Sequence, residues 1–168
     1  MKLIAETKHM RRIKICICVV IGGLALSGVT AFPLETELLW LTRHCAWAPD
    51  IMTTWLNNVY HAVASTNEKY PYLSYGTDWL AFAHLLLALL FIGPLNNPVK
   101  NVWVIQFGLA ACILIFPLAF IAGGVRHIPL FWRLIDCSFG LFGGIPLFIC
   151  YRGIKLLDAG GPLANGNG

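Results

Sequence analysis

Residues 102–122, with the sequence VWVIQFGLAACILIFPLAFIA, decide the class of this protein. The stretch contains no charged side chain, and about 20 consecutive apolar residues are enough for a helix that crosses a bilayer. Three further stretches are also predominantly apolar, so we predict four spans at about residues 13–31, 78–95, 102–122 and 129–151. The expected fold class is an all-α integral membrane protein built as a bundle of four transmembrane helices.

The composition of the whole chain agrees with this class. Its 168 residues are 58% hydrophobic and 12% charged, with a mean hydropathy of +0.71. Soluble domains carry about twice that share of charged residues, and disordered chains carry far fewer apolar ones. The length suits a single domain, which we place at residues 1–158. Residues 159–168, AGGPLANGNG, are expected to form a disordered tail.

The distribution of basic residues predicts the orientation of the spans. No nucleic-acid-binding motif accompanies them, so the lipid bilayer, and not nucleic acid, is the expected partner. Lys and Arg are enriched in the cytoplasmic loops of membrane proteins. One side of the predicted bundle carries Lys2, Lys8, Arg11, Arg12, Lys14, Lys100, Arg152 and Lys155, and the other carries Arg43, Lys69 and Arg126. Both termini are therefore expected in the cytoplasm, with a bacterial inner membrane as the leading location and a eukaryotic membrane as the alternative.

The first span has a rival interpretation as a secretory signal peptide. A basic flank precedes residues 13–31, and Val29-Thr30-Ala31 resembles a cleavage site. However, the apolar run is longer than the usual core of a signal peptide, and Gly22, Gly23 and Ser27 are typical of a helix-packing face. We expect a retained helix.

The outer segment 32–77 is too long to be a mere connector. Two short amphipathic helices are predicted within it, at about residues 34–46 and 50–64, and a tyrosine-rich stretch follows them. Because aromatic rings settle at the level of lipid headgroups, this cap is expected to lie on the outer membrane surface; packing as a soluble cap on the bundle is the alternative. The cap residues that could contact a ligand are His61, Tyr72 and Tyr75.

Small residues and prolines predict how the spans pack. Gly140 and Gly144 form a G-x-x-x-G face, and Gly108, Ala111 and Cys112 form a small stripe. Such faces allow close helix contact, either within the bundle or between protomers. The spans also contain three prolines at which we expect kinks, Pro94, Pro117 and Pro146.

Ionisable side chains inside the spans are the strongest candidates for function, because each is costly in the membrane unless it is paired or hydrated. His84 lies about 9 Å below the start of its span and Asp136 about 10 Å below the start of the last span, at 1.5 Å per residue. We predict that these two helices are neighbours and share one polar cluster. Its members are Asp78, His84, Arg126, His127, Arg133 and Asp136.

The cluster has a structural and a functional interpretation. Arg133 could pair with Asp136 or Asp78 and simply join two helices. Alternatively, the cluster could form a proton-accessible or anion-binding pocket that opens outward. Haem b is a further hypothesis, with His84 and either His61 or His127 as axial ligands. The six cysteines contain no C-x-x-C and no zinc spacing, so neither a metal site nor thiol–disulfide chemistry is expected.

Three functional hypotheses follow. The leading one is a non-catalytic inner-membrane component that docks a partner protein or a small amphiphile near the polar cluster. The second is a membrane-embedded enzyme or redox subunit that uses His84 and Asp136. The third is a small transporter or channel made of several copies, because one four-helix bundle leaves little room for a pore. A membrane-protein partner or further copies of this chain are accordingly expected.

The predicted orientation can be tested by labelling single cysteines in a cysteine-free background. With an impermeant thiol reagent, Ser65→Cys should be labelled in intact cells, because residues 32–77 are predicted to lie outside. Ala159→Cys should be labelled only after permeabilisation. The opposite pattern would invert the orientation.

Overall fold

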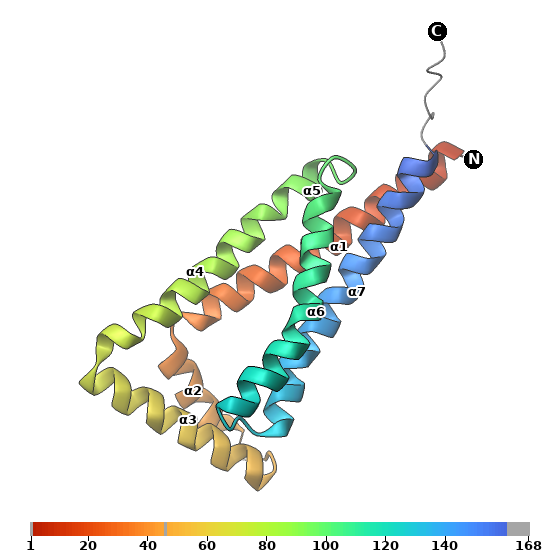
Figure 1. Ribbon diagram of the computed structural model, residues 1–168. Coiled ribbons are helices and arrows are strands. Elements are labelled where there is room, and N and C mark those ends of the chain that lie inside the picture. Colours follow the sequence, from red (N-terminus) through yellow and green to blue (C-terminus); the bar gives the residue numbers. More distant parts are fainter. Residues whose placement is uncertain (1, 46, 161–168) are drawn as a thin grey trace. The chain divides into compact units, whose positions relative to one another are not determined.

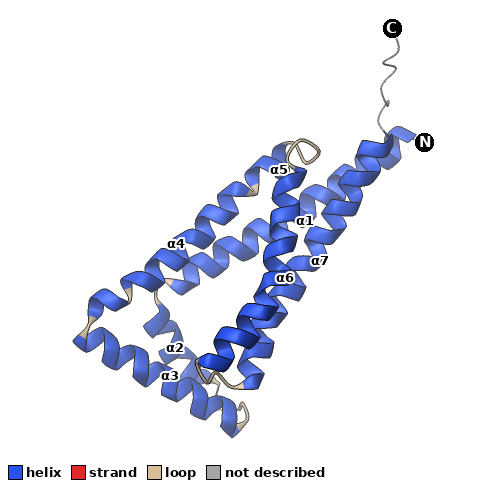
Figure 2. Ribbon diagram, in the orientation of Figure 1, coloured by secondary structure: helices blue, strands red, loops and turns tan. Residues whose placement is uncertain are grey.

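The structure is a computed structural model that describes residues 2–45 and 47–160. In this part of the chain every regular element is a helix (Figure 2). The all-α prediction is therefore confirmed. In chain order the elements are α1 (Lys2–Ala31), α2 (Leu34–His44), α3 (Asp50–Lys69), the short 3₁₀ helix η1 (Pro71–Leu73), α4 (Tyr75–Leu90), α5 (Ile92–Asn96), α6 (Val102–Val125) and α7 (Leu130–Gly160).

Four helical segments are long and apolar enough to cross a membrane, as the sequence predicts. They are Thr7–Ala31, Pro71–Asn96, Val102–Val125 and Leu130–Asp158. The first and last extend beyond the predicted spans because the flanking Lys, Arg, Met and Leu residues are good helix formers. Ala159 and Gly160 belong to α7 and not to a tail, and the rest of the predicted disordered tail lies outside the described residues.

The chain divides into two compact units, which are described separately. The first contains the chain up to Gly22 and from Ala88 onward, and the second contains Gly23–Leu87. Helices α1 and α4 contribute residues to both units (Figure 1). The single membrane domain predicted for residues 1–158 stays a prediction.

The centre of the first unit is the antiparallel hairpin of α6 and α7, which lie side by side (Figure 1). A Cβ atom on Gly140 of α7 would lie only 2.7 Å from the backbone oxygen of Cys112 on α6. A Cβ atom on Gly108 of α6 would lie 2.9 Å from both Leu147 and Phe91. The predicted glycine faces therefore make contacts within one chain. The sequence alone had also allowed packing between protomers.

The N-terminal part of α1 packs on the C-terminal part of α7 in the same unit. Ile13 and Ile17 are 1% and 0% exposed, and Ile154 on α7 is also buried. A Cβ atom on Gly153 would lie 2.9 Å from Ile13, and the Cys150 thiol donates a hydrogen bond to the Ile13 carbonyl at 3.5 Å. This packing explains why α7 continues past the predicted end of its span.

The second unit contains the predicted cap. Both cap helices form, as α2 and α3, and their buried leucines are Leu38 and Leu56. Asn67 on α3 donates to the Glu35 carboxylate on α2 at 2.7 Å, and the Ser74 hydroxyl before α4 donates to the Asn67 amide oxygen. This polar chain connects three successive segments of the cap.

The three prolines have different consequences. The break between α4 and α5 falls at Phe91, three residues before Pro94. A proline ring clashes with the carbonyl four residues earlier, which here belongs to Leu90, the last residue of α4. Pro117 and Pro146, in contrast, lie inside the uninterrupted helices α6 and α7.

The α6–α7 contact predicts the effect of adding one methyl group. Gly140→Ala should lower the free energy of unfolding by about 1–3 kcal/mol, because the new Cβ atom meets a backbone oxygen that cannot move alone. Gly143→Ala is the matched control, since its Cβ atom would make an ordinary 3.4 Å contact with the Cys112 sulfur. Alanine favours helix by about 1 kcal/mol over glycine, so the control should be neutral or stabilising. Unfolding in mixed micelles, followed by circular dichroism, measures both, and equal effects would contradict the packing.

Candidate functional site at the α6–α7 turn

The turn between α6 and α7 is tight, and two backbone hydrogen bonds close it at the end of α6. The N–H of His127 donates to the Gly124 carbonyl at 3.2 Å, and the N–H of Ile128 donates to the Gly123 carbonyl at 2.9 Å. These two bonds form the Schellman motif, which places one residue in the left-handed region. That residue is His127, with φ 55°, the non-glycine residue with positive φ in the described chain. Glycine is the usual occupant, so the imidazole is held here at a conformational cost.

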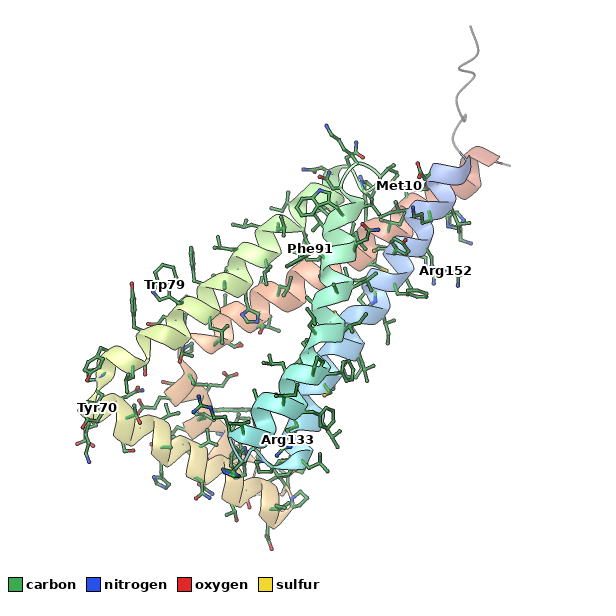
Figure 3. All side chains as sticks on the ribbon, in the orientation of Figure 1. Met10, Tyr70, Trp79, Phe91, Arg133 and Arg152 are labelled. Atoms are coloured by element: carbon green, nitrogen blue, oxygen red, sulfur yellow. The ribbon has the colours of Figure 1, made fainter. Side chains whose placement is uncertain are left out.

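Arg133, on the first turns of α7, folds back onto this helix ending (Figure 3). Its Nε donates to the Ile128 carbonyl at 2.6 Å. Its aliphatic stem lies against Gly123, where a Cβ atom would meet the Arg133 Cδ at 3.0 Å. The missing side chain at Gly123 therefore makes room for Arg133, and the guanidinium group gains an acceptor that belongs to the turn itself.

A cavity of about 270 Å³ opens beside the turn. Its wall combines apolar residues of α6 with two side chains of opposite charge, Arg126 and Asp136. Arg126 can only donate hydrogen bonds, and an ionised Asp136 can only accept them. The cavity could thus hold a small molecule with an apolar body and a polar group that both donates and accepts. The residues lining it are Ile115, Leu118, Ala119, Ala122, Gly123, Arg126, Ile128 and Asp136.

Four of the six predicted cluster residues come from this end of the first unit: Arg126, His127, Arg133 and Asp136. Of these, Arg126 and Asp136 line the same cavity. The pairing of Arg133 with Asp136 stays a prediction, and the observed partner of Arg133 is the Ile128 carbonyl.

Asp78 and His84 lie on α4 in the second unit, so the predicted link from His84 to Asp136 joins the two units and stays a prediction. The His84 Nδ1 is 2.8 Å from the Leu80 carbonyl oxygen, one turn earlier on α4. In a neutral imidazole this contact assigns the proton to Nδ1 and leaves Nε2 as an acceptor.

The three cap candidates each contact a neighbour in the sequence. The ring of His61 lies 5.3 Å from that of Tyr60, Tyr72 lies 6.1 Å from Tyr70, and Tyr75 lies 6.0 Å from Trp79. Tyr70 and Trp79 project outward from the ribbon (Figure 3). These contacts are separate, so they define an exposed aromatic surface and not one binding site.

The described side chains contain no group of three or more His, Cys, Asp or Glu residues that could hold a metal ion. Haem ligation by His84 with His61 or His127 needs only two imidazoles and stays a prediction.

Comparison with family models, curated proteins and solved structures gives no match to this chain. The site must therefore be interpreted from its own chemistry.

Sequence reasoning missed the residues that shape the site. It did not predict the role of Gly123, which leaves room for the Arg133 side chain. The Gly123-Gly124 pair, two residues before Arg126, was a usable signal, because glycine is enriched where helices end. The apolar lining at Ala119 and Ala122 carried no signal, because any apolar helix contains such residues.

The backbone of the turn predicts an effect at residue 127. The free energy of unfolding of His127→Gly should be about 1 kcal/mol higher than that of His127→Ala. Both substitutions remove the imidazole, but only glycine adopts φ 55° without strain. Chemical unfolding of the purified chain in micelles measures the difference. A lower stability for the glycine variant would show that residue 127 does not have a left-handed backbone.

Proposed function

We propose that this chain is a multi-pass membrane protein with the α6–α7 turn on the outer side. Only 17–22% of the residues in the apolar windows of the four long helices are buried inside the protein. Ile113, Leu114 and Phe142 are 68%, 64% and 73% exposed. Apolar surface of this extent requires a non-aqueous surrounding, and hydrocarbon supplies one.

The packing of α1 on α7 supports the proposed orientation. Contacts of Ile13 with Cys150 and Gly153 place the beginning of α1 beside the end of α7. The basic N-terminal flank and the pair Arg152 and Lys155 thus lie at one end of the first unit, as the positive-inside rule requires for a shared cytoplasmic side. The exposed aromatic rings of the cap are the kind that settle at a membrane interface.

Within this membrane protein, the cavity beside the α6–α7 turn docks a small amphiphile. The cavity carries the proposal, because one small apolar space combines a donor from Arg126 with an acceptor from Asp136. A volume of about 270 Å³ lies just below the usual range of ligand pockets, so it favours a small molecule over a helix of a partner protein. A medium-chain alcohol has the required chemistry, since its hydroxyl group both donates and accepts.

The proposal can be tested by photoaffinity labelling of the full chain in lipid nanodiscs with a diazirine-bearing medium-chain alcohol. The label should map to residues 115–128 and to the neighbourhood of Asp136, and unlabelled alcohol should compete better than the matching alkane. Ala122→Phe should abolish the competed labelling, because the phenyl ring fills the cavity.

Ala110→Phe is the matched control, because Ala110 is exposed on α6 away from the cavity. This variant should be labelled like the wild type. Labelling spread evenly over all apolar helices, or unaffected by Ala122→Phe, would contradict the docking site. A Soret band in the purified protein would instead favour the redox hypothesis, and a stable oligomer that conducts ions would favour the channel.

A further inference from the structure

Helix α1 has a second face that its packing on α7 leaves uncovered. Ile13, which packs on α7, and Ile17 are both buried. The other face follows spacings of three and four along α1 and lines an open groove of about 870 Å³, with Leu157 of α7 as its wall. Met10, labelled in Figure 3, belongs to this face. The groove is lined by Thr7, Met10, Arg11, Lys14, Ile15, Cys18, Val19 and Leu157.

The groove changes from basic to apolar along its length. Arg11 and Lys14 lie toward the start of α1 and are exposed. Ile15 and Val19 follow and are 54% and 60% exposed. From residue 11 to residue 19 the helix rises about 12 Å, at 1.5 Å per residue. Two cations thus lie at one end of the groove, next to its apolar part.

We propose that this groove binds one anionic phospholipid of the inner leaflet. Arg11 and Lys14 hold the phosphate of the headgroup, and an acyl chain lies along Ile15, Cys18 and Val19 against Leu157. The inference rests on the proposal that α1 crosses the membrane with its N-terminal end in the cytoplasm. It concerns a different site from the amphiphile cavity, which lies at the other end of α7.

Charge complementarity selects this occupant over a second copy of the chain. Among the described side chains that line the groove, two are basic and none is acidic. A symmetric contact through this face would bring cations of both copies together without a counter-charge, which is unfavourable in a desolvated interface. An anionic lipid neutralises both cations and covers the apolar part of the groove at the same time.

The test uses the full-length chain, purified in a mild detergent, with dioleoyl phosphatidylglycerol and dioleoyl phosphatidylcholine as probes. Native mass spectrometry should show one retained phosphatidylglycerol per chain and little phosphatidylcholine. Arg11→Gln combined with Lys14→Gln should weaken retention about thirtyfold, because each basic side chain near an anionic lipid contributes about a fivefold factor.

Lys8→Gln combined with Arg12→Gln is the matched control. It removes the same charge from exposed positions of the same helix that do not line the groove. It should retain phosphatidylglycerol like the wild type, and Ile15→Trp, which keeps every charge but fills the groove, should lose it. Equal losses in the two double variants, or full retention by Ile15→Trp, would overturn the site.

Failure of the site and failure of the membrane proposal give different results. Alkaline carbonate extraction of native membranes should leave wild type and all variants in the pellet. Release of the wild type into the supernatant would overturn the membrane proposal itself. A pelleted protein without selective retention of phosphatidylglycerol would overturn only the lipid site.

Discussion

The close approach of α6 and α7 determines where the charged side chains around the α6–α7 turn can lie. At Gly140 the two helices are so near that a single methyl group would meet the backbone oxygen of Cys112. Between apolar helices in lipid there is little hydrophobic driving force, so association depends on this kind of tight van der Waals contact. The contact fixes the distance between the helix axes, and that distance sets the size of the cavity between Ala119 and Asp136.

The turn at the end of α6 also supplies a hydrogen-bond acceptor for Arg133, a charged side chain near an apolar surface. A charge there needs acceptors, and in a regular helix the carbonyl groups are already used. The Schellman turn uses the N–H groups of His127 and Ile128, and it leaves the Ile128 carbonyl to accept from Arg133. Arg133 therefore stabilises the turn that supplies its partner, and Arg126 remains on the wall of the cavity.

The sequence predicted the elements that depend on local composition. Helix α6, Val102–Val125, departs from the prediction only by three residues at its end, because an uninterrupted apolar run defines both its length and its limits. Helix α7 continues past the predicted end of its span, because its packing on α1 at Gly153 and Ile13 adds to the helix-forming composition of that segment. The break at Phe91 could be predicted from Pro94, since that effect is also local.

The site was predicted less well because its contacts depend on the backbone conformation of the turn, which residue spacing alone does not give. Spacing suggested Asp136 as the partner of Arg133, but the observed acceptor at Ile128 depends on the hydrogen bonds of the turn. The presence of Arg126, Arg133 and Asp136 in one region was predictable, because ionisable groups are rare in apolar helices and their depth follows from counting residues. The link from His84 to Asp136 stays a prediction, because these two residues belong to different units.

The two candidate sites differ in charge, and this difference determines what each can bind. The cavity at the α6–α7 turn holds a cation and a carboxylate, so it favours a neutral polar group that satisfies both. The groove on α1 holds two cations, and the described side chains that line it include no carboxylate, so it favours an anion. A molecule suited to one site would leave an unpaired charge in the other, and an unpaired charge near hydrocarbon is costly. In the two proposals, the difference between the ligands of the two sites therefore follows from the position of one carboxylate, Asp136.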